Sequence, residues 1–438
     1  MARSGAFLLA AWLVSPVAAA EKSTTSACAD AVLGARVIAV CGARLAPLAD
    51  VPTSELRVLK FSGGRPIPIP FQVDECDAAG ELVLDANGRG AGDSTLGARS
   101  VLLFRIEDAG DRDPRAAARG AVEIRISGGA GTPQRSVYVE RASAKARRST
   151  RDDVDYDPSS DMIRAERYTI GFQGPLVVHF AVADGKGRDR EDLVDRFKAR
   201  VDAHFLWGLF GFRRNEDDVT EEVLGYKDGP IRVVRRSRIG IEIGWGLPAP
   251  SIINEDYFYA DHAEAPVHIS LPFSLAYVFG DLDVRLYLDF LKLDGFRVVA
   301  EGLPSGARIV GSPPTDSAPE NEPRTHWFLL EGRSVRFFHR LRFGPTLDRL
   351  DCRLFYVDDP ARPDPPESTP GSVPAIGYRL TDWSSVRRGR HEIWMDTYIV
   401  DGPATADQVL ARLAAPIAVD VRLTDGAGAS HRRRKSDN

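Results

Sequence analysis

The sequence predicts a mainly β protein, built from antiparallel β-sandwich domains with one or two short helices. Apolar and polar residues alternate over many short segments, which is the pattern of strands with one buried face. Turns rich in Gly, Pro and Asp separate these segments. The 438 residues are 43% hydrophobic and 27% charged, as in ordinary globular proteins, and can form two or three domains. The net charge of −5 is spread along the chain and argues against a nucleic-acid partner.

The N-terminus has the pattern of a secretory signal peptide. Arg3 precedes the apolar run Ala6–Val14, and small residues precede a cut after Ala20. The run is shorter than the roughly 20 residues that a membrane helix needs. We therefore expect residues 1–20 to be removed, and the mature protein to be exported to the periplasm or outside the cell without spanning a membrane.

Residues 21–145 are predicted to form an N-terminal β domain. Its expected strands are Leu56–Phe61, Pro66–Val73, Val101–Ile106, Val122–Ile126 and Ser136–Glu140. Residues 146–160 are strongly charged, include Pro158 and are predicted to be a linker.

Residues 161–425 are predicted to form a larger β-sandwich domain. Arg188–Ala199 places Leu193, Val194 and Phe197 at helical spacing and predicts an amphipathic helix. A second short helix is expected at Thr405–Leu413, after a Gly-Pro turn. Residues 426–438 are basic and are expected to be disordered.

The stretch from Gly229 to Leu293 organises this domain. Residues 229–245 alternate β-branched residues with arginines, as a strand does. A polar, aromatic turn is expected at residues 254–264, followed by strands at His268–Phe279 and Asp283–Leu293.

Four cysteines lie beyond the predicted cut, and their even number favours disulfides in an oxidising compartment. They allow three full pairings. A Cys28–Cys41 bond would close a short loop, and a Cys76–Cys352 bond would join distant regions.

Two segments carry resemblances to known families. Residues 67–75, Ile-Pro-Ile-Pro-Phe-Gln-Val-Asp-Glu, and residues 101–112, with Asp-Ala-Gly-Asp-Arg, resemble a group of uncharacterised exported bacterial proteins with a P-x-Q-x-D strand. Residues 229–232, Gly-Pro-Ile-Arg, are similar to a strand of galactose-mutarotase-like sandwich proteins, which include some polysaccharide lyases. The resemblances imply a carbohydrate-related β-sandwich and carry no catalytic residue across.

The densest group of chemically versatile side chains lies between Asp256 and His268. Tyr257 and His262 are the candidate base and acid for elimination from a uronic acid, with Arg235 neutralising the substrate carboxylate. Arg236, Tyr259 and His268 are candidate ligand-binding residues, and so is Trp207 within an alternating aromatic run. Two other interpretations remain: the carboxylates and imidazoles could hold a divalent metal, or the segment is a polar loop that covers a sheet edge.

One segment resembles a calcium loop. Asp85, Asn87 and Asp93 occupy positions one, three and nine of such a loop, with glycine at six. Arg89 and Leu96 stand where further ligands are expected, so a plain Gly/Asn turn also fits. The sequence predicts no cofactor, with calcium at this loop as the one alternative, and no nucleotide-binding motif occurs.

Two functions follow. The first is an exported envelope protein that binds a glycan or a protein partner without catalysis, because no motif of known mechanism occurs. The alternative is a carbohydrate-active enzyme, a lyase or epimerase that acts on an acidic polysaccharide.

Overall fold

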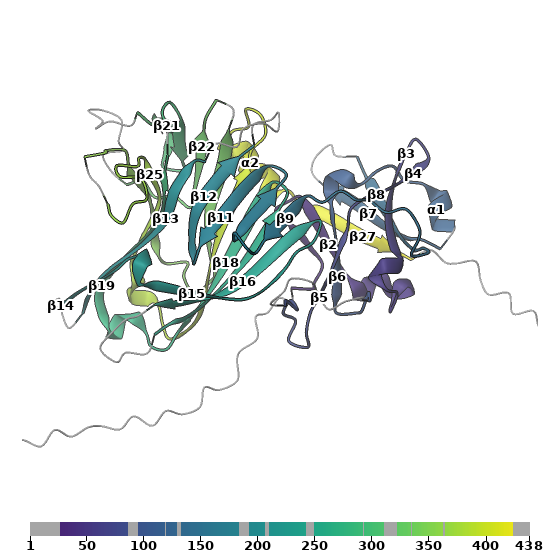
Figure 1. The fold of residues 1–438 in the computed structure, drawn as a ribbon, viewed down its shortest axis with the longest axis horizontal. Helices are drawn as coiled ribbons and strands as arrows, with labels where there is room; N and C mark the ends of the chain where they lie inside the picture. Colours follow the sequence, from purple (N-terminus) through teal and green to yellow (C-terminus); the bar gives the residue numbers. More distant parts are fainter. Residues whose placement is uncertain are drawn as a thin grey trace, which may run out of the picture.

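The chain forms two β-rich lobes in a computed structural model (Figure 1). The structure describes residues 27–85, 95–118, 120–128, 133–183, 192–205, 210–241, 249–291, 293–310, 322–333, 335–361 and 364–423. The predicted signal peptide and basic tail, together with Asn87, Asp93 and Trp207, lie outside the described residues. The mainly β, antiparallel sandwich fold is confirmed.

The N-terminal lobe is built from two sheets. The first has the order β1 (Ala31–Leu33), β2 (Val37–Cys41), β6 (Ser100–Arg105), β5 (Gln72–Glu75). The second has the order β27 (Ile417–Arg422), β7 (Val122–Gly128), β8 (Arg135–Arg141), β3 (Leu56–Ser62), β4 (Arg65–Pro68). Strand β27 therefore returns from the far end of the chain to complete this lobe, and Figure 1 shows it in yellow beside β7. The domain boundaries drawn from the sequence stay a prediction.

Strand β6 is buried on both faces. All six of its residues are buried. Leu102 and Phe104 point into the core of the N-terminal lobe, and Val101 and Leu103 pack toward Tyr259 of the larger lobe. A strand covered on both sides reads as a continuous apolar run, which is what residues 101–104 show.

The larger lobe is a sandwich with a nine-stranded sheet on one side. This sheet has the order β15 (Val219–Lys227), β16 (Arg232–Ile241), β17 (Ser251–Tyr259), β18 (His262–Leu271), β26 (Gly389–Ile399), β23 (Arg336–Phe343), β22 (Trp327–Glu331), β20 (Arg297–Ala300), β21 (Leu303–Arg308). Two smaller sheets face it. One has the order β12 (Leu176–Val182), β11 (Tyr168–Gln173), β10 (Met162–Ala165), β9 (Val154–Asp157), and the other β14 (Phe210–Arg214), β13 (Val194–Phe205), β19 (Phe279–Phe290), β25 (Ala375–Thr381), β24 (Asp351–Val357).

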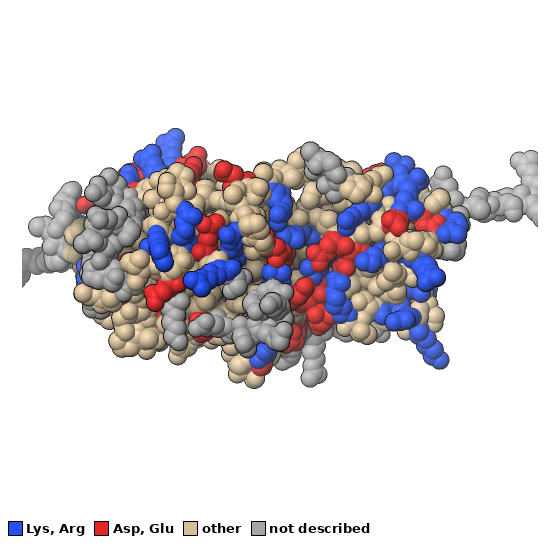
Figure 2. Space-filling view, turned by 90° about the horizontal axis from the view of Figure 1, so that it is seen from above, with Lys and Arg blue, Asp and Glu red and all other residues tan. Residues whose placement is uncertain are grey.

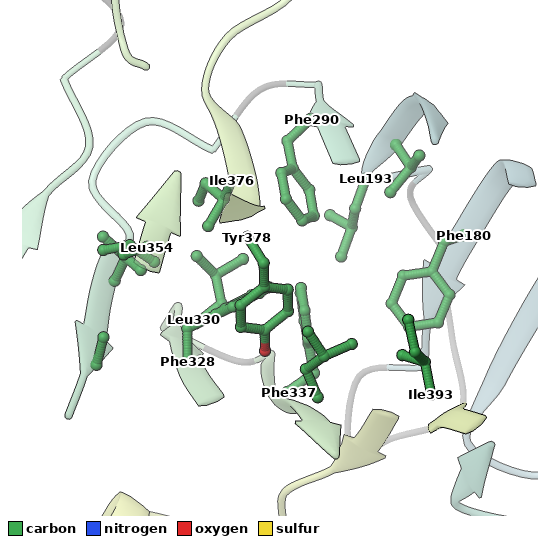
Figure 3. Close-up of a cluster of buried hydrophobic side chains, with 14 of the residues drawn as sticks. Phe180, Leu193, Phe290, Phe328, Leu330, Phe337, Leu354, Ile376, Tyr378 and Ile393 are labelled. Carbon is green, nitrogen blue, oxygen red and sulfur yellow. The ribbon is translucent and has the colours of Figure 1, made fainter. Parts of the chain in front are cut away.

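The main hydrophobic core fills the space between these sheets. Phe337 of the nine-stranded sheet lies with its ring centroid 5.6 Å from that of Phe180 and 5.8 Å from that of Phe290, which belong to the two facing sheets. Figure 3 shows these aromatic rings turned toward one another. The inward positions of all three sheets thus share one core.

Helices are few and short in the described part of the chain. The α-helices are α1 (Pro114–Ala118) and α2 (Ala406–Ala414), and the 3-10 helices are η1 (Gly42–Leu48), η2 (Thr53–Glu55), η3 (Ile106–Asp108), η4 (Glu216–Asp218), η5 (Leu275–Tyr277) and η6 (Trp383–Ser385). Helix α2 confirms the helix expected at Thr405–Leu413, and Thr405 and Gln408 form its capping box. No helix among the described residues is long and apolar enough to cross a membrane.

The helix expected at Arg188–Ala199 is wrong where the segment is described. Residues from Val194 onward form strand β13, which pairs with β19 along its length. The physical reason is a period of two from residue 196 to 203, in which Arg196, Lys198 and Arg200 alternate with less polar residues. Pairing with a long neighbour outweighs the helical spacing of three apolar side chains.

Two other expectations need correction. The turn expected over residues 254–264 is only two residues long, Ala260 and Asp261, because strands β17 and β18 occupy the rest. The cysteines form one bond, Cys28–Cys76, instead of either bond considered above. Cys41 and Cys352 are free thiols.

Candidate functional site

The nine-stranded sheet separates the predicted site residues onto its two faces. Residues directly opposite each other on paired strands share a face. Tyr257 lies opposite Glu264, and the ring of His262 stacks on Tyr259 at 4.3 Å, so these four residues share the outer face. Arg235, on neighbouring strand β16, belongs to the inner face. The structure therefore brings Tyr257 and His262 to one face and leaves Arg235 on the other.

Arg235 is enclosed within the sandwich. Its guanidinium donates to Glu221 at 2.8 Å and to Asp161 at 2.9 Å, and lies 4.8 Å from the centre of the Phe172 ring. Its side chain is 1% exposed. Burial raises the pKa of neighbouring Asp256 to about 7, with the charge of Glu221 adding to the effect and that of Arg235 opposing it. Arg235 is thus occupied by carboxylates of the protein itself.

His262 is closed off where the two lobes meet. Its ring lies between those of Tyr259 and Tyr398, with centroids 4.3 and 5.4 Å away. A Cβ added to Gly34, in the turn between β1 and β2, would come within 2.2 Å of its Nε2 atom. Nδ1 of His262 lies 2.8 Å from a carboxylate oxygen of Asp261. The ring is 1% exposed and cannot reach a ligand without movement of the N-terminal lobe.

The pKa of Asp261, the partner of His262, is set by the charges around it. Burial alone would raise the pKa of Asp261, but the hydrogen bond and charge of His262, with the charges of Arg36 and Arg105, lower it to about 2. Asp261 therefore stays ionised and orients the imidazole. This is a structural pair at the lobe junction.

Tyr257 and Tyr259 are covered by the N-terminal lobe. The Tyr257 hydroxyl donates to Glu255, and the Arg232 guanidinium lies 4.9 Å from the centre of its ring. Burial raises the pKa of Tyr257 well above its usual value, and raises that of Tyr259 as well. A tyrosine held in its neutral form is a poor base for proton abstraction.

Arg236 and His268 also lie on the outer face, toward its open part. Arg236 donates through Nε to Glu255, and its side chain is 18% exposed. Nδ1 of His268 lies 3.3 Å from a carboxylate oxygen of Glu392, and this histidine is 41% exposed. Both are accessible enough to contact a ligand. Asp85, from the predicted calcium loop, forms an isolated bridge with the backbone of Tyr226.

The accessible part of the outer face centres on an arginine pair that sequence reasoning missed. Arg340 and Arg342 of β23 both donate to Asp396 of β26, at 2.9 and 2.7 Å, and Asp396 is fully buried. The Arg342 guanidinium also lies 4.5 Å from the ring centre of Trp394. The side chains of Arg340 and Arg342 are 23% and 38% exposed. The available signal was alternation, Arg340-Leu-Arg342 on one strand and Trp394-Met-Asp396 on another, but pairing of strands so distant in sequence cannot be read from it.

Two covered regions bound the accessible part of the outer face. The N-terminal lobe packs on Val234, Tyr257 and Tyr259 at one end. Helix α2 packs on Leu329 and Phe338 at the other. Glu264 lies opposite Asp396 between them, and burial raises its pKa. Among the described residues, no group of three or more His, Cys, Asp or Glu side chains could hold a metal ion.

Comparisons with known proteins give distant likenesses of fold. A scan against family models finds no match, and a comparison with curated proteins finds none either. Among solved structures, an α-mannosidase from Enterococcus faecalis V583 has a TM-score of 0.46 at 9% identity, covering 88% of this chain and 44% of that chain. A glycosyl hydrolase family 38 protein from Enterococcus faecalis has a TM-score of 0.44 at 9% identity over 88% of this chain and 45% of that chain. A candidate aldose 1-epimerase from Klebsiella pneumoniae has a TM-score of 0.28 at 11% identity over 57% of this chain and 76% of that chain. This chain spans less than half the length of the first two, and these likenesses assign it no activity.

Proposed function

We propose that this chain is an exported envelope protein that binds an acidic glycan without catalysis on the outer face of its nine-stranded sheet. The observation that carries the proposal is the pair Arg340 and Arg342 on the single carboxylate Asp396. One carboxylate offsets one of the two guanidinium charges, and both guanidiniums stay partly exposed.

A uronate carboxylate matches this arrangement. Each guanidinium has five N–H donors in a fixed fork, and contacts with Asp396 use only part of them. Arginine binds carboxylates through two parallel hydrogen bonds, which gives both affinity and orientation. The Arg342 guanidinium packs against the ring of Trp394, so its orientation is held before a ligand binds.

Binding is favoured over the lyase or epimerase alternative by the state of the candidate catalytic groups. A base and an acid must reach the same substrate atoms. His262 is sealed under Gly34, Tyr257 is covered and holds its proton, and Arg235 lies on the opposite face. The disulfide Cys28–Cys76 supports export, because such bonds persist in oxidising compartments.

Thermal unfolding with trigalacturonate and with neutral maltotriose tests the proposal. A ligand that binds the native state raises the melting temperature, so we expect a saturable rise with trigalacturonate alone. Arg342→Gln should weaken binding about tenfold, since it removes a charge-assisted contact. Arg238→Gln is the matched control, because Arg238 is an exposed, ion-paired arginine of the same sheet.

Three outcomes bear on the alternatives. Equal shifts with both sugars would contradict recognition of the carboxylate. No shift with any sugar would favour a protein partner instead. Release of an unsaturated uronate, followed by ultraviolet absorbance, would establish a lyase, and loss of that activity in Tyr257→Phe and His262→Ala would assign it to the residues predicted from the sequence.

A further inference from the structure

The arginine pair exposes positive charge, while the carboxyl groups beside it are buried. Arg340 and Arg342 donate to Asp396 through their Nε and Nη2 atoms, which leaves their Nη1 atoms for a ligand. Asp396 is fully buried, and Glu264, opposite it on β18, is 8% exposed. A ligand that approaches this part of the outer face therefore meets two guanidinium groups before it meets a carboxylate.

An exposed carboxylate lies next to the arginine pair on β26. Trp394 lies opposite Arg342, and Glu392 lies two residues before Trp394 on the same face of the sheet. Diagonal neighbours of this kind on paired strands lie about 7–8 Å apart. Glu392 is 38% exposed, and one of its carboxylate oxygens lies 3.3 Å from Nδ1 of His268, which is itself 41% exposed. The exposed charge thus changes from positive to mixed over a distance that a short oligosaccharide can span.

Toward β15, the outer face continues with bases and carboxylates in pairs. Arg236 donates to Glu255, and Arg238 donates to Glu222 at 2.6 Å. A sugar hydroxyl group both donates and accepts hydrogen bonds, so such a mixed surface suits neutral sugar units. Figure 2 shows a similar mixture on the face that it presents, where basic and acidic side chains lie side by side over the larger lobe. The two exposed guanidiniums on one buried carboxylate therefore distinguish the β23 end from the rest of the face.

We infer that the ligand of this face is an acidic heteroglycan, in which the uronate held by Arg340 and Arg342 is followed by neutral sugar units that lie over Glu392. This assignment rests on the proposed function and narrows the class of glycan. Glu392 sets the specificity, because a second uronate beside it would meet a like charge. Like charges about 5–8 Å apart at a protein surface lower the affinity by roughly three- to tenfold.

Calorimetric titration of the whole protein with three trisaccharides tests the assignment. An aldotriouronic acid carries one glucuronate on xylobiose, trigalacturonate carries three uronates, and xylotriose carries none. We expect the aldotriouronic acid to bind about three- to tenfold more tightly than trigalacturonate, and xylotriose to bind least. Equal or tighter binding of trigalacturonate would overturn the heteroglycan assignment and keep the proposed binding of acidic glycans. Binding of neither acidic trisaccharide would overturn both.

The variant Glu392→Gln separates the effect of charge from the identity of the sugars. It should strengthen trigalacturonate binding by about three- to tenfold and change that of the aldotriouronic acid by less than about twofold. Glu222→Gln is the matched control, because Glu222 is also an exposed, arginine-paired glutamate of this sheet, on the edge strand β15. Equal changes for both ligands, or no change for trigalacturonate, would refute the role of Glu392. Arg342→Gln should weaken both acidic ligands, which checks that both use the arginine pair.

Discussion

A buried ion cluster joins the two lobes, and its removal gives the sharpest test of how they are held together. Asp74 of β5 is fully buried. It accepts hydrogen bonds from Arg232 at 2.9 Å and from Gln72 at 2.9 Å, and its other close cation is Lys227 at 3.1 Å. Burial alone would raise the pKa of Asp74, but the charges of Arg232 and Lys227 outweigh this and lower it. One carboxylate of the N-terminal lobe thus forms ion pairs with two cations of the sandwich.

The Asp74→Asn variant keeps the side-chain volume and removes the charge. Arg232 is 4% exposed and would remain buried without its counter-charge. Breaking a buried pair in this way costs about 3–5 kcal/mol of unfolding free energy. The variant Arg232→Met combined with Asp74→Asn should cost less than the sum of the two single changes by about 1–3 kcal/mol, because the double variant leaves no buried arginine unpaired.

Urea unfolding at neutral pH, followed by tryptophan fluorescence, measures these free energies. Asp155→Asn is the control: its carboxylate is 60% exposed and 3.8 Å from Arg164, so the change should cost under about 1 kcal/mol. The folded pKa of Asp74 is depressed below 3.8, so its stabilisation is present above pH 3.8 and lost as the pH falls through the folded value. A cost below about 1 kcal/mol for Asp74→Asn, or additive single changes, would refute the reasoning.

Three further results are expected. Gly34→Ala should lower the melting temperature more than Gly63→Ala: both glycines have positive φ, +54° and +55°, but only at Gly34 would the new Cβ meet a side chain, that of His262. Equal shifts would mean that the His262 contact carries no cost. Asp256→Asn should raise stability at pH 8 by up to about 4 kcal/mol and leave it unchanged below pH 3.8. The folded pKa of Asp256 is about 7, so the contribution of its carboxyl group to stability is fully present below pH 3.8 and is lost as the pH rises through 7. An unaltered pH profile of urea unfolding would contradict this. Lys198→Met should destabilise more at pH 8 than at pH 5. Lys198 contacts Asp289, and burial raises the pKa of Asp289 to about 6. The Asp289 carboxylate can therefore lose its charge at pH 5 but not at pH 8. Equal losses at both pH values would disprove that coupling.

The sequence predicted strands well where alternation was undisturbed. The alternation from residue 229 corresponds to β16, and the apolar run at residues 101–106 corresponds to β6. It failed at residues 194–199, where the helical spacing of Leu193, Val194 and Phe197 competes with the alternation that begins at Arg196. Only the pairing of β13 with β19 decides between them, and that pairing is not a local property.

The site was harder to predict than the fold because its partners are distant in sequence. Arg235 is bound by Asp161, 74 residues away, and Arg342 is bound by Asp396, 54 residues away. Alternation places Tyr257 and Glu264 on one face of the sheet once the register of β17 and β18 is known. No sequence signal gives that register. The same limit explains why residues on opposite faces, such as Arg235 and Tyr257, were combined into one constellation.

The route of the chain makes the lobe junction a fixed part of the fold. Strand β27 pairs with β7 through residues Ile417 to Arg422, so the second sheet of the N-terminal lobe is complete only when the end of the chain has returned to it. Without β27, the edge of β7 would be unpaired, and exposed edges are prone to misassociation. The chain therefore leaves the N-terminal lobe, forms the sandwich and re-enters the lobe, which ties the two together at both ends. The buried contacts of Asp74 with Arg232 and Lys227 lie along this junction, so an ion cluster adds to the hold that the route of the chain already provides.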